Sequence, residues 1–281
     1  MKRVRIVTDS TSDVPPEIAE RLHITIVPAY IQIGAHSYRD EASSAGLSRG
    51  EFYARLPRMP VAPTTSVPPV CEFAAAYRSL SDETDEVIAI MASSRLSGMY
   101  SVARLGALEV TDVKVHVVDS GQVTMGLGWM AIAAAEAAAS GNSAREILTL
   151  VEEMRGRVRV YAMLDTLEYV RRSGRVSWAR AKAAQILRIK PIVSLLLGEV
   201  TDLGRTRTTR RAIDQLAELT RSLGPLERLA VLHTYASRTE ELCRRLAGLC
   251  SPGQLLTVAV TTVIGAHVGP RGLGVAAVVA R

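Results

Sequence analysis

Apolar runs that alternate with helix-like stretches most constrain how this chain can fold. In the first half, strand-like runs occupy 4–7, 24–33, 87–91 and 113–118, and helix-like patterns occupy 15–22, 48–56, 70–80, 97–108 and 124–139. Such alternation is typical of a parallel sheet whose faces are covered by helices. The sequence therefore predicts an N-terminal α/β/α domain, and the Ala-rich run near 131–139 predicts a helix that approaches its neighbours closely.

Clusters of Ser, Thr and Asp follow three of these strands. They lie at 8–13, 93–97 and 119–120, and a fourth cluster lies at 64–66. Open α/β sheets bind ligands at the carboxyl ends of their strands, so the clusters predict one polar site. The same residue types also cap helices and form turns, so the clusters alone leave both interpretations open.

Near Arg157 the pattern changes, which places a domain boundary there. Residues 191–197 and 199–203 are typical of a hairpin because Gly198 can supply the turn. We expect a parallel-sheet α/β domain over 1–157 and a mixed-sheet α/β domain over 158–281. The other elements expected after the boundary are strands at 157–164, 229–233, 255–260 and 274–279 and helices at 166–172, 178–186, 209–223 and 237–249.

Composition bounds the environment of the chain. Hydrophobic residues make up 48% of the sequence but aromatic residues only 4%, so interior walls must be aliphatic, which suits alkyl chains. Three cysteines without Cys-x-x-Cys spacing favour a reducing cytoplasm. No run approaches the roughly 18 apolar residues of a membrane span, so we expect no secretion and no integral membrane association.

The net charge of +6 raises the question of nucleic-acid binding, since eleven Lys and Arg residues lie between Arg171 and Arg211. That segment has Trp178 as its single aromatic residue for base stacking and contains no nucleic-acid motif. We therefore expect no nucleic-acid partner, and a regulatory nucleic-acid module is only a third hypothesis. Basic faces more often serve solvation or acidic protein partners.

Enzyme motifs are weak in this sequence. Neither G-x-G-x-x-G after the first strand nor G-x-x-x-x-G-K-[ST] is present, and Gly269–Gly274 is typical of a plain turn. Ser94, His267 and Asp119 could form a hydrolase relay, but the G-x-S-x-G motif is absent and no spacing requires that assembly. An acyl or phosphate ester hydrolase that uses the hydroxyl clusters and His267 is the alternative function.

No metal site is expected, because the five histidines never occur four residues apart or beside paired cysteines. His23, His116 and His233 alternate with apolar residues and are predicted to be core or strand-edge side chains. His267 differs, because it precedes a Gly/Pro turn where the backbone can approach a ligand and the imidazole can donate a hydrogen bond.

Nine short motifs, in this order, resemble the DegV proteins, which include the fatty-acid-binding subunits of bacterial fatty acid kinases. The likeness spans nearly the whole chain. The motifs are Ile6–Pro15, Ile26–Pro28, Tyr38–Asp40, Pro63–Ser66, Ser93–Gly98, Val118–Ser120, Gly174–Ser177, Ile189–Ile192 and His267–Pro270.

The resemblance implies a long-chain fatty acid at the junction of the two α/β domains, with its tail in an apolar tunnel. It implies that Thr65 and Ser94 hydrogen-bond the carboxylate and that His267 helps to position it. Further candidates for the head group are Ser66, Ser93 and Arg271.

The resemblance also implies a carrier rather than an enzyme, without a cofactor or an ATP site of its own. A separate ATP-dependent fatty acid kinase subunit would dock and phosphorylate the bound acid, which would place the chain in phospholipid metabolism. Arg207 lies where the family carries a partner-facing Arg. The basic segment 171–211 either meets an acidic kinase or forms a solvated face.

Five positions depart from the family pattern near the expected head group. Arg271 is the most consequential, because a guanidinium replaces the usual Gly and can pair with the carboxylate, alter docking or point to water. The others are Val67 for Gln, Met99 for Thr, Ser173 for Gly and Val268 in the His267 loop.

Overall fold

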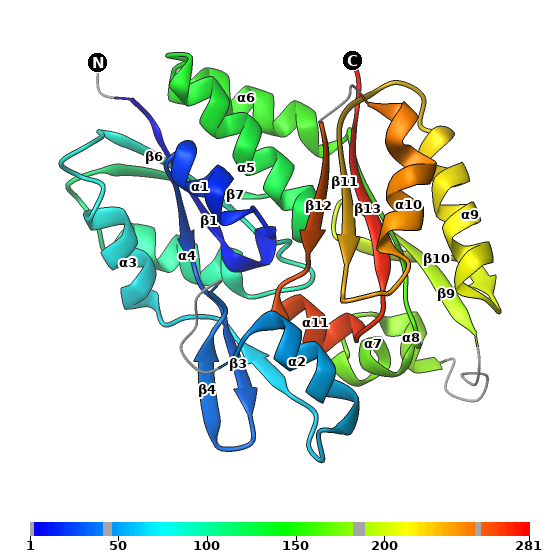
Figure 1. The fold of residues 1–281 in the computed structure, drawn as a ribbon. Helices are drawn as coiled ribbons and strands as arrows, with labels where there is room; N and C mark the ends of the chain where they lie inside the picture. Colours follow the sequence, from blue (N-terminus) through cyan, green and yellow to red (C-terminus); the bar gives the residue numbers. More distant parts are fainter. Residues whose placement is uncertain (1–2, 42–46, 182–188, 251–253) are drawn as a thin grey trace.

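Two large β-sheets form the framework of the protein in the computed structural model, which describes residues 3–41, 47–181, 189–250 and 254–281 (Figure 1). The first is a parallel four-stranded sheet in the order β2-β1-β6-β7. Its strands are β1 (Arg5–Asp9), β2 (Ile24–Val27), β6 (Glu86–Met91) and β7 (Lys114–Asp119). The parallel sheet predicted for the first half is confirmed.

The second large sheet is mixed and has the order β10-β9-β8-β13-β11-β12. Only the β11–β12 pair within it is parallel. The strands are β8 (Val158–Met163), β9 (Lys190–Leu196), β10 (Glu199–Thr206), β11 (Leu226–His233), β12 (Leu255–Ala259) and β13 (Leu273–Val279). The mixed sheet predicted for the second half is therefore confirmed, and the boundary near Arg157 stays a prediction.

The hairpin predicted around Gly198 is also confirmed, as β9 and β10 pair in antiparallel register. Its two turn residues, Leu197 and Gly198, have φ values of 50° and 78°. Two-residue hairpin turns need such positive values to match the twist of their strands.

Helix α5 (Thr124–Ala139) lies between the two sheets and contacts strands of both. It is apolar on all sides, which is typical of a buried helix. Its glycines permit close packing: a Cβ on Gly126 would lie 2.8 Å from the Val160 side chain, and one on Gly128 would lie 2.5 Å from the Ser12 carbonyl oxygen. These contacts come from glycines that precede the Ala-rich run, so the close approach expected of residues 131–139 stays a prediction.

The remaining helices cover the outer faces and the ends of the sheets (Figure 1). Helices α3 (Val70–Arg78) and α4 (Met99–Leu108) pack on the first sheet, and α9 (Thr209–Arg221) and α10 (Thr239–Leu246) pack on the second. The others are α1 (Pro16–Arg21), α2 (Arg49–Arg55), α6 (Ala144–Arg155), α7 (Glu168–Ser173), α8 (Ser177–Ala181) and α11 (Thr262–Val268). The helix expected over 178–186 begins at Ser177, and its end lies outside the described residues.

A third, small sheet has the order β4-β3-β5, with β3 (Tyr30–Ile33), β4 (His36–Arg39) and β5 (Thr64–Ser66). The single extended segment predicted over 24–33 is therefore two strands in two sheets. Pro28 explains the break, because a residue without an N–H group cannot continue the ladder of hydrogen bonds. No sequence pattern predicts β4, β5 or α11.

Three histidines are predicted to be core or strand-edge side chains, and His233 among them lines the cavity between the two large sheets. His116 on the edge strand β7 and His233 at the end of β11 are partly buried. His23 is exposed in the turn before β2, so the core or strand-edge position predicted for it is wrong. Across the described ranges, no group of three His, Cys, Asp or Glu side chains is placed to hold a metal ion. No helix in the described part of the chain is long and apolar enough to cross a membrane.

Candidate functional site

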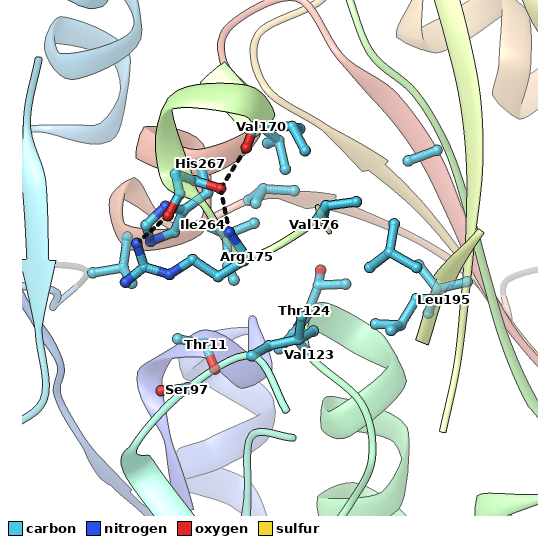
Figure 2. A pocket seen from close by; sticks show the side chains of 18 of the residues that line it. Thr11, Ser97, Val123, Thr124, Val170, Arg175, Val176, Leu195, Ile264 and His267 are labelled. Carbon is cyan, nitrogen blue, oxygen red and sulfur yellow. Dashed lines mark hydrogen bonds between the residues drawn. The ribbon is translucent and has the colours of Figure 1, made fainter. Parts of the chain in front are cut away.

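A cavity of about 520 Å³ lies where the carboxyl ends of β1 and β6 face strands β8 and β9 of the second sheet (Figure 2). Its position agrees with the rule that open α/β sheets bind ligands beyond the carboxyl ends of their strands. Its volume falls within the roughly 300–1,000 Å³ typical of small-molecule sites. We therefore take this cavity as the candidate ligand site.

Three of the four hydroxyl clusters contribute to its lining, through Thr11, through Thr65 and Ser66, and through Ser94 and Ser97. The fourth cluster does not line the cavity, so the prediction of one site for all four is wrong in that part.

Asp119, in the fourth cluster, does not line the cavity but contacts the backbone of a loop that does. Its carboxylate accepts the backbone N–H groups of Ser94 at 3.2 Å and Gly121 at 2.9 Å. This contact fixes the loop that carries Ser94.

Thr65 and His267 meet at the polar end of the cavity, although they are 202 residues apart in the sequence. The Thr65 Oγ1 atom lies 2.9 Å from His267 Nε2. Thr65 is on β5, and His267 is in the last turn of α11. If Nε2 carries the ring proton, the Thr65 hydroxyl hydrogen is free to donate to an anion in the cavity.

Burial lowers the pKa of His267 to about 4, and the nearby positive charge of Arg175 adds to this effect. A neutral imidazole at physiological pH has one N–H donor and one acceptor. His267 can therefore orient a ligand by hydrogen bonding, but it does not supply a positive charge.

Arg175 supplies the positive charge that His267 lacks, and it is a lining residue that we did not single out from the sequence. Its guanidinium donates to the Ser173 carbonyl oxygen at 2.7 Å, and Figure 2 shows it beside His267. Within the described residues no carboxylate pairs with Arg175. The signal was present in the motif Gly174–Ser177, which also forms part of the resemblance.

The backbone around Arg175 is held by a short hydroxyl chain. Ser173 Oγ donates to the Val170 carbonyl oxygen at 2.7 Å and accepts the Arg175 N–H at 3.3 Å (Figure 2). Ser173, one of the departures from the family pattern, thus links α7 to the segment that carries Arg175.

The rest of the lining is mainly aliphatic, as the composition predicts. Ala162 on β8 is in register with Gly274 on β13 and with Val193 on β9, and all three line the cavity. Small side chains at Ala162 and Gly274 leave space that larger residues would fill. Other members of this wall are Val160, Val176, Leu195, Val263 and Ile264.

Two of the additional head-group candidates lie outside this lining. Ser93 is buried, and its Oγ accepts the N–H of Arg95. Arg271 adopts a φ of 60°, and its guanidinium donates to Asp165, with Nε 3.0 Å from Oδ2. Arg271 therefore forms an ion pair with a carboxylate of the protein itself, which is none of the three roles expected for it.

Ser94, His267 and Asp119 do not form a hydrogen-bonded catalytic relay in the described part of the chain. Among the described residues, the hydrogen-bond partner of the His267 ring is Thr65, and Asp119 accepts backbone N–H groups. A Ser–His–Asp relay needs the acid to orient the imidazole, so the geometry does not favour a hydrolase with these residues. Arg207 is exposed between β10 and α9, and its role stays a prediction.

The fold and the site define a two-domain α/β protein with a ligand cavity at the junction of its sheets. The chain belongs to the DegV family: the family model, described as an uncharacterised protein of the DegV family, matches residues 3–280. A DegV domain-containing protein of Streptomyces coelicolor is 37% identical, with 98% of each chain covered. Protein DegV of Bacillus subtilis is 33% identical over 97% of this chain and 98% of its own.

Solved structures of the family are similar over almost their entire length. A structure described as fatty acid binding of a DegV family protein from Thermus thermophilus has a TM-score of 0.90 and 30% identity, covering 99% of this chain and 100% of its own. DegV of Bacillus subtilis, described as a fatty acid binding protein, has a TM-score of 0.87 and 30% identity, with 100% of each chain covered.

Proposed function

We propose that this chain binds a long-chain fatty acid, with the tail against the aliphatic wall and the carboxylate at Thr65, Ser94 and His267. The observation that carries the proposal is a single cavity that joins an aliphatic wall to an end with hydroxyl, imidazole and guanidinium groups. The fatty-acid-binding relatives at 30% identity support it.

The expected binding energies agree with a tail on the aliphatic wall and a carboxylate at the polar end. Each buried methylene contributes roughly 0.8 kcal/mol, so a tail of more than about ten carbons supplies most of the affinity. Hydrogen bonds to a carboxylate are about twice as strong as neutral ones, and they select the acid over other apolar molecules.

Native mass spectrometry of the purified protein, followed by lipid extraction, tests the proposal directly. We expect one C14 to C18 acid per chain, retained from the expression host or taken up when added. A protein that neither retains nor takes up such an acid would contradict the proposal.

The head-group assignment has a matched control on the same strand. Thr65→Ala should weaken fatty-acid binding about tenfold in a fluorescent-lipid displacement titration, since it removes a charge-assisted hydrogen bond. Thr64→Ala removes the same hydroxyl from an exposed neighbour outside the lining and should leave the affinity unchanged. Equal affinities for both variants would exclude Thr65 from the head-group site.

We further propose that the chain presents this carboxylate to a separate kinase subunit. Ser94, Arg95 and Gly98 line the cavity and are exposed, so its polar end reaches the surface. A carboxylate oxygen there could attack the γ-phosphorus of ATP held by the partner, with ADP as the leaving group and an acyl phosphate as the product.

An acyl-phosphate assay with ATP and a bacterial fatty acid kinase subunit tests presentation. Arg207→Ala should lower the rate without changing fatty-acid affinity, whereas Arg210→Ala, an exposed Arg on the nearby helix α9, should not. If Arg207→Ala leaves the rate unchanged, Arg207 does not face the partner.

A further inference from the structure

Two buried aspartates that the proposed site does not use lie at the opposite end of the helix that carries His267. Asp13 is 2% exposed and Asp40 is 5% exposed. Both precede β5 in the sequence, whereas α11 lies near the end of the chain. Their contacts therefore join distant segments at the head-group end of the cavity.

The two carboxylates accept the first backbone N–H groups of α11. Asp13 Oδ1 accepts the Thr261 N–H at 2.8 Å, and Asp40 Oδ1 accepts the Thr262 N–H at 3.2 Å. Thr261 precedes the helix, but its own side chain makes no capping hydrogen bond. The aspartates thus replace the local cap that most helices obtain from their own sequence.

The carboxylates are themselves fixed by other donors. Asp40 Oδ1 also accepts the Thr262 hydroxyl at 2.8 Å, and Asp40 Oδ2 accepts the Ser10 hydroxyl at 2.9 Å. Asp13 Oδ2 accepts the hydroxyl of Thr124 on α5 at 2.5 Å. A buried carboxylate with all its contacts satisfied holds its partners in one arrangement.

Residues of α2 hold the same end of α11. The Tyr53 hydroxyl lies 3.0 Å from the carbonyl oxygens of Val260 and Thr261, and a Cβ on Gly265 would lie 2.3 Å from the Tyr53 hydroxyl oxygen. The Arg49 guanidinium donates to the Ala259 carbonyl oxygen at 2.8 Å. The start of α11 therefore has little room to shift.

We infer that Asp13 and Asp40 are positioning residues for the ligand head group, because they fix the start of α11 and thereby hold His267 against Thr65. Helix α11 has seven residues, so its start is only one to two turns from His267. A shift of the helix at Thr262 would also move His267, whose ring nitrogen must stay within hydrogen-bond distance of Thr65. This inference rests on the proposed fatty-acid function.

The cleanest test removes one buried hydroxyl from each of two helices. Thr262→Val deletes the hydroxyl that donates to Asp40, and Thr220→Val deletes a buried hydroxyl that donates to Leu216 in the remote helix α9. We expect Thr262→Val to weaken fatty-acid binding about fivefold and Thr220→Val to leave it unchanged at similar losses of melting temperature.

A second pair of variants tests the carboxylate itself. Asp40→Ala should weaken binding about tenfold, and Asp40→Asn should restore most of the affinity because its amide oxygen can still accept from Thr262. Nitrogen NMR of the His267 ring in the ligand-free protein should show an altered Nε2 signal in Asp40→Ala and the wild-type signal in Asp40→Asn.

The outcomes separate this inference from the proposed function. Wild-type affinity and an unchanged His267 signal in Thr262→Val and Asp40→Ala, together with weakened binding in Thr65→Ala, would overturn the positioning role and leave the fatty-acid site intact. A wild-type protein that binds no fatty acid would overturn the function itself, while the His267 signal would still report whether Asp40 holds the helix.

Discussion

The two parts of the cavity are built in different ways. The aliphatic wall comes largely from neighbouring strands of one sheet, where Val160, Ala162 and Leu195 are held by regular register. The polar end combines β5, the loop after β6, the end of α11 and the segment between α7 and α8. The wall therefore supplies affinity in proportion to buried area, and the polar end fixes the orientation of the ligand.

The largest expected effect comes from filling the wall. Ala162→Phe would place an aromatic ring where Ala162 and Gly274 leave space, and excluding about four methylenes costs roughly 3 kcal/mol, or about a hundredfold in affinity for a C16 acid. A displacement titration measures this loss. A C10 acid, which needs less of the cavity, should lose much less.

Tyr161→Phe is the control for this wall variant, because Tyr161 lies on the same strand and packs on the other core cluster. It should bind the C16 acid as the wild type does. If Ala162→Phe bound C16 and C10 acids with equal losses, the wall would not set the depth of the site.

Elements with a clear local signal could be predicted from the sequence. Gly198 between two apolar runs predicted the β9–β10 hairpin, and the apolar run from Thr124 to Ala139 predicted α5 with its bounds. Helix α11 has no such signal, because its cap comes from Asp13 and Asp40, more than 200 residues earlier in the chain. Strands β4 and β5 were missed because each is short and lies at the edge of the small sheet.

The site was predictable only in part for the same reason. Periodicity and composition indicate an aliphatic interior, but no spacing rule joins Thr65 to His267 across 202 residues. The resemblance to the family supplied that pair, and the structure brings the two side chains together. Arg175 was missed because nothing in its charge distinguishes this Arg from the other cations of the basic segment 171–211.

The pH dependence of stability tests whether the polar end of the cavity is as well shielded from solvent as the aliphatic wall. His267 has a pKa near 4 in the folded protein and about 6.5 in the unfolded protein. As the pH falls below about 6.5, the unfolded state therefore takes up a proton that the folded state does not, and the folded state loses stability. The stability that a neutral His267 contributes is present above about pH 6.5, and about 2 kcal/mol of it should be lost between pH 7 and 5.

Denaturant unfolding of the wild type and of His267→Gln at pH 7 and 5 measures this contribution. Asp13 acts in the opposite sense, because burial raises its pKa to about 6 and its contribution falls as pH rises. Asp13 is present in both proteins, so the difference between them isolates His267. An identical pH dependence in both proteins would show that the pKa of His267 is the same in the folded and unfolded states and that solvent reaches the polar end of the cavity.

The smallest expected effect is that of charge at the exposed mouth of the polar end. Arg175→Gln should weaken binding of a long-chain acid about fivefold, or about 1 kcal/mol, because an exposed cation is screened by solvent and salt. Binding of the matching long-chain alcohol should not change, since it carries no charge. Arg171→Gln, an exposed cation nearby outside the cavity lining, should affect neither ligand.

This pair of ligands separates charge from shape at the polar end. If Arg175→Gln weakened the acid and the alcohol equally, Arg175 would act as part of the wall, and the division between the two regions would fail there. The same substitution should raise the pKa of His267, because the charge of Arg175 helps to lower it. NMR titration of the His267 ring in both proteins measures that shift, and an unchanged pKa would show that the Arg175 charge does not reach the imidazole.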